Sequence, residues 1–267
     1  MPSSICFKMP CGRELQSSCM EEPDSIVERA RKLSPWHFNI ELAPGIWTAD
    51  CNCAEESDPD KKNVAIINPL EMRSFFKRYY PAGLAGKDCL DVGCNSGGYT
   101  FLAHELGARS AVGIEIREHW LAQAELVKAV KYPEIQNVYF ERREVGAYLR
   151  DATRTFDIVL FKGIFFHLAD PIHVLMGYCD LAMDTLLVDT PCSYEIPEEC
   201  FQPKPQSRTH LMGGVDGLGW LPGGPRAIQE ILRFKGFRRT EIVYWHGDPN
   251  RSGWGRLRIV AKRNNQS

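Results

Sequence analysis

Several features that define other classes of protein are missing from this sequence. No apolar run approaches the roughly 20 residues that a membrane-spanning helix needs. The first residues, from Met1 to Cys6, lack the basic and then apolar start of a secretory signal. Internal repeats and low-complexity tracts are missing too. With 44% hydrophobic residues among 267, we expect one large core in a cytoplasmic protein that has no membrane partner.

An excess of positive charge is also missing. The sequence holds 32 Lys and Arg residues against 34 Asp and Glu residues, a net charge of −2. Non-specific binding to nucleic acid draws its affinity from the neutralisation of phosphates, so the composition argues against it. The part from Arg226 to the end is net basic, however, with ten basic residues against three acids. A solvated surface, an anionic substrate and a contact with RNA each fit this local excess.

Paired metal-binding cysteines are the third absence. Ten cysteines are present, and five of them lie between residues 6 and 53, but these five form no Cys-x-x-Cys pair. Compact groups of His and carboxylate residues are missing as well. We therefore expect no metal site. We also expect most of the cysteines to be reduced thiols, because a chain of this length needs no disulfide staples.

One segment, residues 89–106, carries the strongest functional signal. It begins as a short apolar strand, continues as a glycine-rich turn and ends as a helix. Gly93 and Gly97 allow backbone conformations that a Cβ atom hinders, and the amides at the start of the helix would point at a ligand above the strand end. The pattern predicts a nucleotide-like ligand at this turn.

The acids around this turn favour one class of ligand. A second apolar run, residues 110–115, ends on Glu115, where the next parallel strand would deliver a carboxylate to the two hydroxyls of a ribose. The second glycine of the dinucleotide fingerprint is replaced by Asn95. Asp91 ends the first strand, and an acid there suits a ligand with a cationic amino group better than one with two phosphates. S-adenosylmethionine is therefore favoured over a dinucleotide.

Helices and strands alternate regularly after residue 87. We expect strands at 88–92, 110–115, 137–141, 156–161 and 184–189, with helices at 97–106, 118–131, 144–150 and 170–180. Such an alternation predicts an α/β fold with a parallel sheet covered on both faces. A helix at 226–235 precedes two long strands, 237–246 and 255–263, and their tight connection makes the last strand antiparallel. A Rossmann-like sheet that ends in an antiparallel hairpin is typical of S-adenosylmethionine-dependent methyltransferases.

The sequence divides into two parts. Residues 1–80 are expected to form an N-terminal leader and helical cap, and residues 81–267 the S-adenosylmethionine-binding domain. Within the domain, residues 190–225 are rich in proline and glycine and also carry aromatic side chains. A connection of this length in a compact fold is usually disordered or functional, so we expect a substrate lid.

Residues 87–263 resemble a class I S-adenosylmethionine-dependent methyltransferase. The run FDIVLFKGIFFHLADP at 156–171 resembles the branch that contains the bacterial tRNA wobble-uridine carboxymethyltransferases and their small-molecule-modifying relatives. The motif WLP at 220–222 and the helix that follows it fit the same branch. The resemblance implies an enzyme of the EC 2.1.1 class, a transferase with S-adenosyl-L-methionine as its cofactor.

One position departs from the tRNA enzymes. They carry a tyrosine immediately before the histidine of this run, used to hold the carboxylate of carboxy-S-adenosylmethionine, and here Phe166 stands at that position. A phenyl ring cannot donate that hydrogen bond. We therefore expect plain S-adenosylmethionine and a small-molecule acceptor. Modification of tRNA, and a non-catalytic regulator that binds S-adenosylmethionine, are the alternatives.

The resemblance also implies which residues contact the cofactor. Those expected to contact the cofactor are Asp91, Gly93, Asn95, Gly97, Glu115, Ile116, Glu144, Val145, Lys162 and Gly163. Those expected to contact the acceptor are Trp36, His37, Phe166, Tyr194, His210 and Trp220. His167 is the candidate for catalysis, because a group of near-neutral pKa could take a proton from a hydroxyl or amine. A structural histidine that binds the loop is the alternative, and oxygen, nitrogen and carbon acceptors all remain open.

Overall fold

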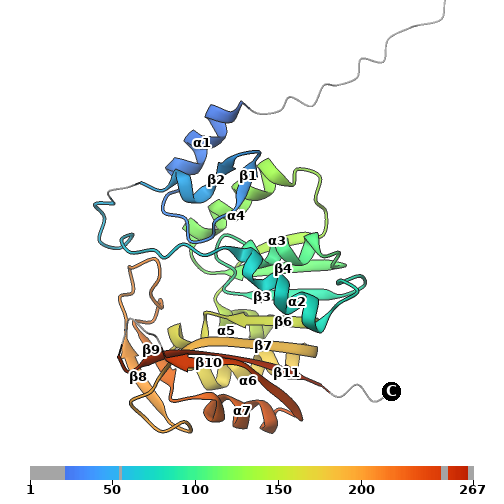
Figure 1. The fold of residues 1–267 in the computed structure, drawn as a ribbon, viewed down its shortest axis with the longest axis vertical. Coiled ribbons are helices and arrows are strands. Elements are labelled where there is room, and N and C mark those ends of the chain that lie inside the picture. Colours follow the sequence, from blue (N-terminus) through green and yellow to red (C-terminus); the bar gives the residue numbers. More distant parts are fainter. Residues whose placement is uncertain (1–21, 54–55, 248–251, 264–267) are drawn as a thin grey trace, which may run out of the picture.

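A seven-stranded sheet lies at the centre of the computed structural model, which describes residues 22–53, 56–247 and 252–263 (Figure 1). The strands are β3 (Asp88–Val92), β4 (Ser110–Glu115), β5 (Val138–Arg142), β6 (Phe156–Lys162), β7 (Ala182–Ser193), β10 (Arg239–Gly247) and β11 (Trp254–Lys262). Their order is β10-β11-β7-β6-β3-β4-β5. Strands β3 to β7 run parallel, and β11 runs antiparallel between β7 and β10. The predicted fold class is confirmed.

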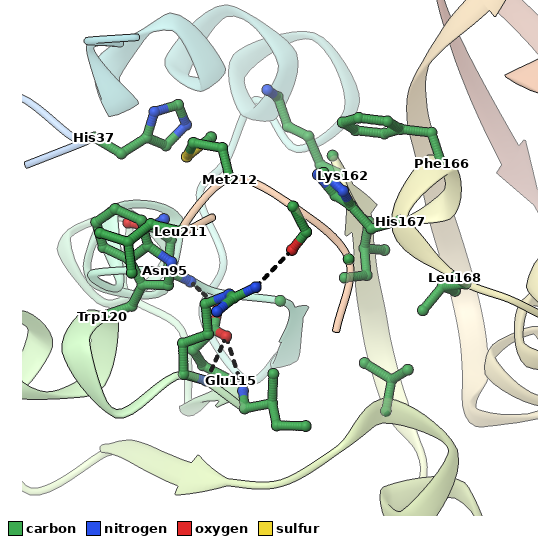
Figure 2. Close-up of a pocket in the computed structure, with 18 of the residues that line it drawn as sticks. His37, Asn95, Glu115, Trp120, Lys162, Phe166, His167, Leu168, Leu211 and Met212 are labelled. Carbon is green, nitrogen blue, oxygen red and sulfur yellow. Dashed lines mark hydrogen bonds between the residues drawn. The ribbon is translucent and has the colours of Figure 1, made fainter. Parts of the chain in front are cut away.

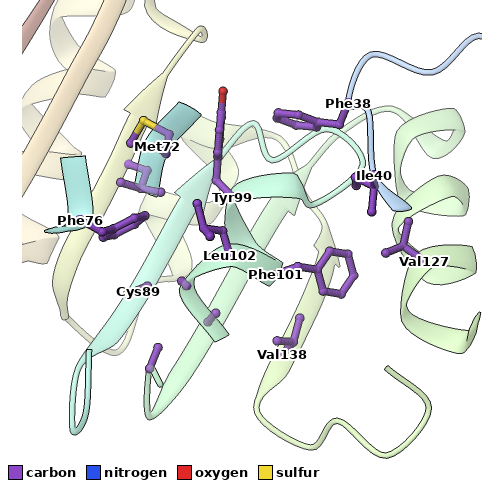
Figure 3. Packing of buried hydrophobic residues seen from close by; sticks show 14 of the residues in the cluster. Phe38, Ile40, Met72, Phe76, Cys89, Tyr99, Phe101, Leu102, Val127 and Val138 are labelled. Atoms are coloured by element: carbon purple, nitrogen blue, oxygen red, sulfur yellow. The ribbon is translucent and has the colours of Figure 1, made fainter. Parts of the chain in front are cut away.

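Residues of the central strands alternate between two hydrophobic clusters, because successive side chains of a strand point to opposite faces. Cys89 and Ile158 belong to the first cluster, whereas their neighbours Leu90 and Val159 belong to the second. The first cluster packs against α2 (Arg73–Tyr79), α3 (Gly98–Glu105) and α4 (Glu118–Lys131), as Figure 3 shows for part of it. The second packs against α5 (Val145–Asp151), α6 (Pro171–Leu181) and α7 (Pro225–Phe234).

Local signals in the sequence explain where these helices begin. Glu144 caps α5 by accepting hydrogen bonds from the backbone N–H groups of the first turn, and Asp170 does the same for α6. Proline occupies the first position of both α6 and α7, where its missing N–H costs nothing. None of the helices in the described residues has the length and apolar character needed to cross a bilayer.

The segment before α2 packs on the main sheet layer and shares its core. It contains α1 (Pro23–Lys32), β1 (Glu41–Ala43), β2 (Ile46–Trp47) and the 3-10 helices η1 (Thr48–Cys51) and η2 (Pro69–Met72). Both α1 and β1 lie against α4 (Figure 1). Phe38 and Ile40 belong to the same cluster as Phe101 and Val127 of the main fold. The division of the chain at residue 80 stays a prediction.

The proline- and glycine-rich stretch 190–225 has more regular structure than the sequence suggested. The strand expected at 184–189 extends to Ser193, and a separate antiparallel hairpin follows, formed by β8 (Phe201–Pro205) and β9 (Leu218–Pro222). Prolines are accepted there because a two-stranded ribbon has only edge strands. We call the residues that join its strands, 206–217, the hairpin tip.

Candidate active site

A cavity of about 660 Å³ opens at the carboxyl ends of β3, β4 and β6. Because β4 lies on one side of β3 and β6 on the other, this is the point where the strand order reverses and α/β sheets bind their ligands. Pockets for small ligands measure roughly 300–1,000 Å³. Figure 2 shows Glu115 on one side of the cavity, and His37 and Lys162 on the opposite side.

Most of the residues expected from the sequence do meet at this cavity. It is lined by His37, Gly93, Asn95, Glu115, Ile116, Glu144, Val145, Lys162, Gly163, Phe166 and His167. Their roles toward a ligand remain predictions. The described residues contain no group of three His, Cys, Asp or Glu side chains placed to hold a metal ion. The cysteines at 6, 11 and 19, part of the N-terminal group considered for a metal, lie outside those residues.

The glycine-rich turn adopts the tight conformation that its sequence predicts. Gly93 and Gly97 have φ angles of +70° and +77°, and Asn95 between them has +53°. A Cβ atom on Gly97 would lie 2.5 Å from the Phe140 ring, so a larger residue cannot be accommodated without a shift of that ring. Asn95 N donates to Glu115 Oε2 at 3.1 Å, which ties the turn to the acid of the next strand.

Glu115 is held by backbone donors from both sides. Its Oε1 accepts from the N–H groups of Ile116 at 2.8 Å and Arg117 at 2.9 Å. Only 8% of the residue is exposed. Burial raises the pKa of the Glu115 carboxyl, and the three backbone donors offset part of that rise. A carboxylate fixed in this way at the cavity wall is suited to accept hydrogen bonds from two vicinal hydroxyls.

Asp91 and Gly97 lie behind the cavity wall, not in it. The Asp91 carboxyl is buried under the turn and accepts a hydrogen bond from Thr100 Oγ1 at 2.8 Å. Burial raises the pKa of Asp91 to about 7. The structure therefore does not bring Asp91 to the cavity, because the helix that follows the turn covers its side chain.

Five charged side chains meet at the end of the cavity away from Glu115: Glu71, Lys162, Asp189, Arg256 and Arg258. Lys162 Nζ lies 3.0 Å from Glu71 Oε1 and 3.9 Å from Asp189 Oδ2. The Asp189 carboxylate also accepts hydrogen bonds from Arg256 Nε at 2.6 Å and Arg258 Nε at 2.5 Å. Three cations face two carboxylates, so this charged wall carries an excess of one positive charge.

Charge–charge contacts set the ionisation of this wall. Burial alone would raise the pKa of Asp189, which is fully buried, but the three neighbouring cations outweigh it and hold that pKa below its ordinary value. Burial would also raise the pKa of Glu71, and the charge of Lys162 with a hydrogen bond from Tyr99 outweighs it. Burial lowers the pKa of Lys162 although both carboxylates oppose the shift. The pKa of each of these residues therefore depends on the charges of the others.

His167 is tied to the hairpin tip. Its Nδ1 lies 2.7 Å from Gln206 Oε1, which also accepts from Gly214 N, while Gln206 Nε2 donates to Phe166 O. The ring centroids of Phe166 and His167 are 3.7 Å apart. Burial lowers the pKa of His167 to about 4. His167 is therefore a weak base and a firm anchor for the loop that carries Phe166.

The hairpin tip forms one wall of the cavity. The sequence predicted a lid within 190–225 but did not indicate which of its residues would contact the cavity. Residues 211–216 line it. Arg117 Nη2 donates to the carbonyls of Arg208 at 3.1 Å and Gly213 at 2.9 Å. Arg117, two residues after Glu115, thus fastens the hairpin tip over the cavity.

A second set of bonds fastens the hairpin tip to the polar loop before η2. Thr209 Oγ1 donates to Asp60 Oδ1 at 2.7 Å, and Leu211 N donates to Asp60 O at 2.8 Å. His210 Nε2 lies 3.0 Å from Lys62 O. His210, expected to contact the acceptor, binds this loop instead and does not line the cavity.

Three aromatic residues expected to contact the acceptor also lie elsewhere. Trp36 is fully buried and donates its indole N–H to a carbonyl of α1. Trp220 donates its indole N–H to Ala169 O at 2.9 Å. Tyr194 stacks on Trp245, with ring centroids 5.8 Å apart. Composition indicates that aromatic residues are present but does not tell which surface they cover.

Of the charged wall, only Lys162 was expected from the sequence, although part of the signal for the other members is there. Arg256 and Arg258 are two positions apart in a strand, which places both on one face. Asp189 is a charged residue at the end of an apolar run. Glu71 and Tyr99 gave no such signal, since their contacts depend on how η2 packs against α3.

Comparison with known proteins identifies the type of domain that carries this site. Residues 84–214 match a family model described as a methyltransferase domain. The chain contains a class I methyltransferase domain. The resemblance predicted from the sequence is confirmed at this level.

Curated relatives of this methyltransferase domain share one name. The tRNA U34 carboxymethyltransferase of Pseudomonas aeruginosa is 30% identical over 168 residues, which cover 60% of this chain and 48% of the relative. The enzyme of that name from Campylobacter lari is 28% identical over 173 residues, which cover 56% of each chain. The chain thus spans about half the length of the curated relatives it matches.

Solved structures share the fold of the methyltransferase domain. The N-terminal domain of EvdMO1, crystallised with S-adenosylhomocysteine and D-fucose, has a TM-score of 0.72 at 19% identity, covering 93% of this chain and all of that one. Magnesium protoporphyrin IX methyltransferase from Synechocystis, with bound S-adenosylmethionine, has a TM-score of 0.50 at 16% identity, covering 73% and 79%. At these identities the likeness concerns the fold.

Proposed function

We propose that this chain is an S-adenosylmethionine-dependent methyltransferase that methylates a small-molecule acceptor in the cytoplasm. The observation that carries the proposal is one cavity with two unlike ends, a glycine-rich turn with Glu115 at one end and the charged wall at the other. The seven cysteines of the described residues are all free, which fits a reducing compartment.

The cavity fits the proposed cofactor. The Glu115 carboxylate would accept from the ribose, and the turn at Gly93 and Asn95 would border the methionine part; all three residues line the cavity. A Cβ atom on Gly163 would meet no atom within 4 Å, so a ligand can approach that backbone closely. Phe166 also lines the cavity, and its ring offers a π face to a sulfonium cation. Ile116, Glu144 and Val145 line the adenine end in this arrangement.

When bound, S-adenosylmethionine supplies a sulfonium methyl group that a nucleophile attacks in line with the breaking bond. The chain must hold the acceptor on that line and exclude water. The hairpin tip, fastened by Arg117 on one side and by Asp60 on the other, closes the cavity for this purpose. We propose His167 as the residue that positions Phe166 and the tip, since its low pKa makes it a weak base.

A small acceptor fits the dimensions and the charge of the chain. A volume of about 660 Å³ leaves room beside a cofactor for a small molecule. The net charge of −2 offers little to a polyanion. The neighbour EvdMO1, solved with D-fucose, supports an acceptor of that size.

Modification of tRNA is the second candidate, favoured by the shared name of the curated relatives. Phe166 speaks against the carboxylated cofactor, because it cannot donate a hydrogen bond to the extra carboxylate.

Two acceptor pools separate these functions. The chain is incubated with S-adenosyl-[methyl-14C]methionine and either a deproteinised small-molecule extract or total tRNA. We expect S-adenosylhomocysteine release and label in the small-molecule pool alone. Label in tRNA would favour the second candidate, and tight cofactor binding without transfer to either pool would favour a regulator.

A further inference from the structure

We infer that His37 is the catalytic base of this site and that the acceptor is an alcohol whose hydroxyl meets His37 Nε2. The inference rests on the proposed methyl transfer and names its substrate class.

The geometry of His37 fixes which ring nitrogen is free. His37 lines the cavity, and its Nδ1 is in a short hydrogen bond with the carbonyl oxygen of Ala65. A carbonyl oxygen only accepts, so Nδ1 carries the proton and the neutral ring keeps its lone pair on Nε2. Within the described residues, Nε2 has no hydrogen-bond partner. This is the tautomer that a general base requires.

The backbone around His37 is rigid, so the base is pre-positioned. Ile67 N donates to His37 O at 2.8 Å, and Asn39 N donates to Ile67 O at 2.8 Å. The next residue, Phe38, is buried against Tyr99, with ring centroids 4.8 Å apart in an edge-to-face arrangement. A side chain held by its neighbours in this way loses little freedom when a substrate arrives.

The groups that face His37 keep it neutral. Burial lowers its pKa, and the positive charges of Lys162 on β6 and Arg256 on β11 lower it further, while Glu71 on η2 and the bond to Ala65 oppose the shift. A neutral imidazole is the form that accepts a proton. His37 is therefore in its proton-accepting form over the whole neutral range.

The charged wall selects the acceptor class. An excess of one positive charge beside His37 repels a protonated amine, whereas it lowers the energy of an oxygen that gains negative charge. In the reaction, the hydroxyl oxygen bonds to the methyl carbon, the carbon–sulfur bond breaks and its electron pair stays on sulfur. The hydroxyl proton moves to His37 Nε2 and then to solvent. The products are a methyl ether and S-adenosylhomocysteine.

The decisive variant is His37→Asn. An asparagine amide can replace Nδ1–H in the bond to Ala65 O but offers nothing at the position of Nε2, so it removes the base and keeps the structural contact. His173→Gln, on the exposed face of α6, is the matched control. S-adenosylhomocysteine affinity, measured by calorimetry, shows whether each variant is folded.

Turnover is measured with S-adenosyl-[methyl-14C]methionine and the deproteinised small-molecule extract, and the methylated product is identified by NMR. We expect an O-methyl product and a kcat about 100-fold lower in His37→Asn, at unchanged S-adenosylhomocysteine affinity. Wild-type activity should fall at acid pH, below the ordinary histidine value of 6.5, and the variant should lack this fall. In His37→Gly, added imidazole should restore part of the activity.

Two results would overturn the inference while leaving the proposed function intact. They are a product methylated on nitrogen or carbon, and a His37→Asn variant with at least half the wild-type kcat. Wild-type protein that releases no S-adenosylhomocysteine above the acceptor-free rate would instead refute the proposed function, and the inference with it.

Discussion

The two ends of the cavity are built in opposite ways. At the Glu115 end, contacts join residues that lie within a short stretch of chain, from Gly93 to Arg117, and the donors are backbone N–H groups. At the charged wall, contacts join side chains from η2, β6, β7 and β11, as far apart as Glu71 and Arg258. The first end depends on local backbone geometry, and the second depends on the whole fold.

Because of this difference, we expect mutations at the two ends to have different effects. Backbone donors stay in place when a side chain changes, so the Glu115 end should lose ligand affinity on mutation and keep its shape. When one partner of a buried ion pair is removed, the other is left as an uncompensated charge in a medium of low dielectric constant. The charged wall should therefore lose stability as well as function when one member is removed.

The largest expected effect is on stability, from Asp189→Asn. Asp189 is fully buried and balances three cations, so its neutralisation should lower the free energy of unfolding by about 3–5 kcal/mol. Urea denaturation measures it. Glu230→Gln, which breaks the exposed pair with Arg233, should cost no more than about 0.5 kcal/mol. Equal losses in the two variants would show that the wall is not a coupled unit.

The next effect is on cofactor affinity, from Glu115→Ala. Loss of hydrogen bonds to a charged acceptor should weaken S-adenosylmethionine binding by about 1.5–3 kcal/mol, or roughly 10- to 150-fold. Calorimetry on the folded variant gives the value. Glu118→Ala, on the exposed start of α4, should bind as the wild type does. Unchanged affinity in Glu115→Ala would remove this residue from the ligand site.

A smaller effect, on protease sensitivity, is expected from Arg117→Ala, which releases the hairpin tip from the segment that follows β4. Two hydrogen bonds from one guanidinium are lost, so cleavage within 206–217 by a protease should increase about 5- to 30-fold, for a local cost of about 1–2 kcal/mol. Arg142→Ala, whose side chain is exposed, serves as the control. If the tip is cleaved at the same rate in both variants, Arg117 does not hold it.

The smallest effect concerns the choice of cofactor. Phe166→Tyr adds one hydroxyl at the cavity wall, which should improve affinity for carboxy-S-adenosylmethionine over S-adenosylmethionine by about 1 kcal/mol, or roughly fivefold. Competition binding measures the ratio. A wild-type chain that already prefers the carboxylated cofactor would contradict the proposed function and favour the tRNA candidate.

The sequence predicts the Glu115 end because that end is local. The turn, the following helix and the acid 24 residues after Asp91 all lie in one run of chain, so spacing alone places them together. Strand alternation predicts the sheet for a similar reason, and most predicted element bounds differ from the structure by one or two residues.

The charged wall and the hairpin depend on information that spacing does not contain. Where the aromatic residues of 190–225 lie depends on the pairing of β8 with β9, and the many prolines of this stretch gave no sign of that pairing. Trp220 therefore bonds to Ala169 O instead of a ligand. Asp91 was expected to contact the cofactor, but its side chain bonds to Thr100 of helix α3 and lies outside the cavity lining, and packing of this kind is not visible in a motif.

A crystal structure of the chain with S-adenosylhomocysteine tests the account most directly. We expect the two ribose hydroxyls to lie within hydrogen-bonding distance of the Glu115 carboxylate. The sulfur atom should point toward Lys162, with free volume left beside His37. A ribose bound against the charged wall, or an adenosine that fills the space beside His37, would contradict the assignment of the two ends.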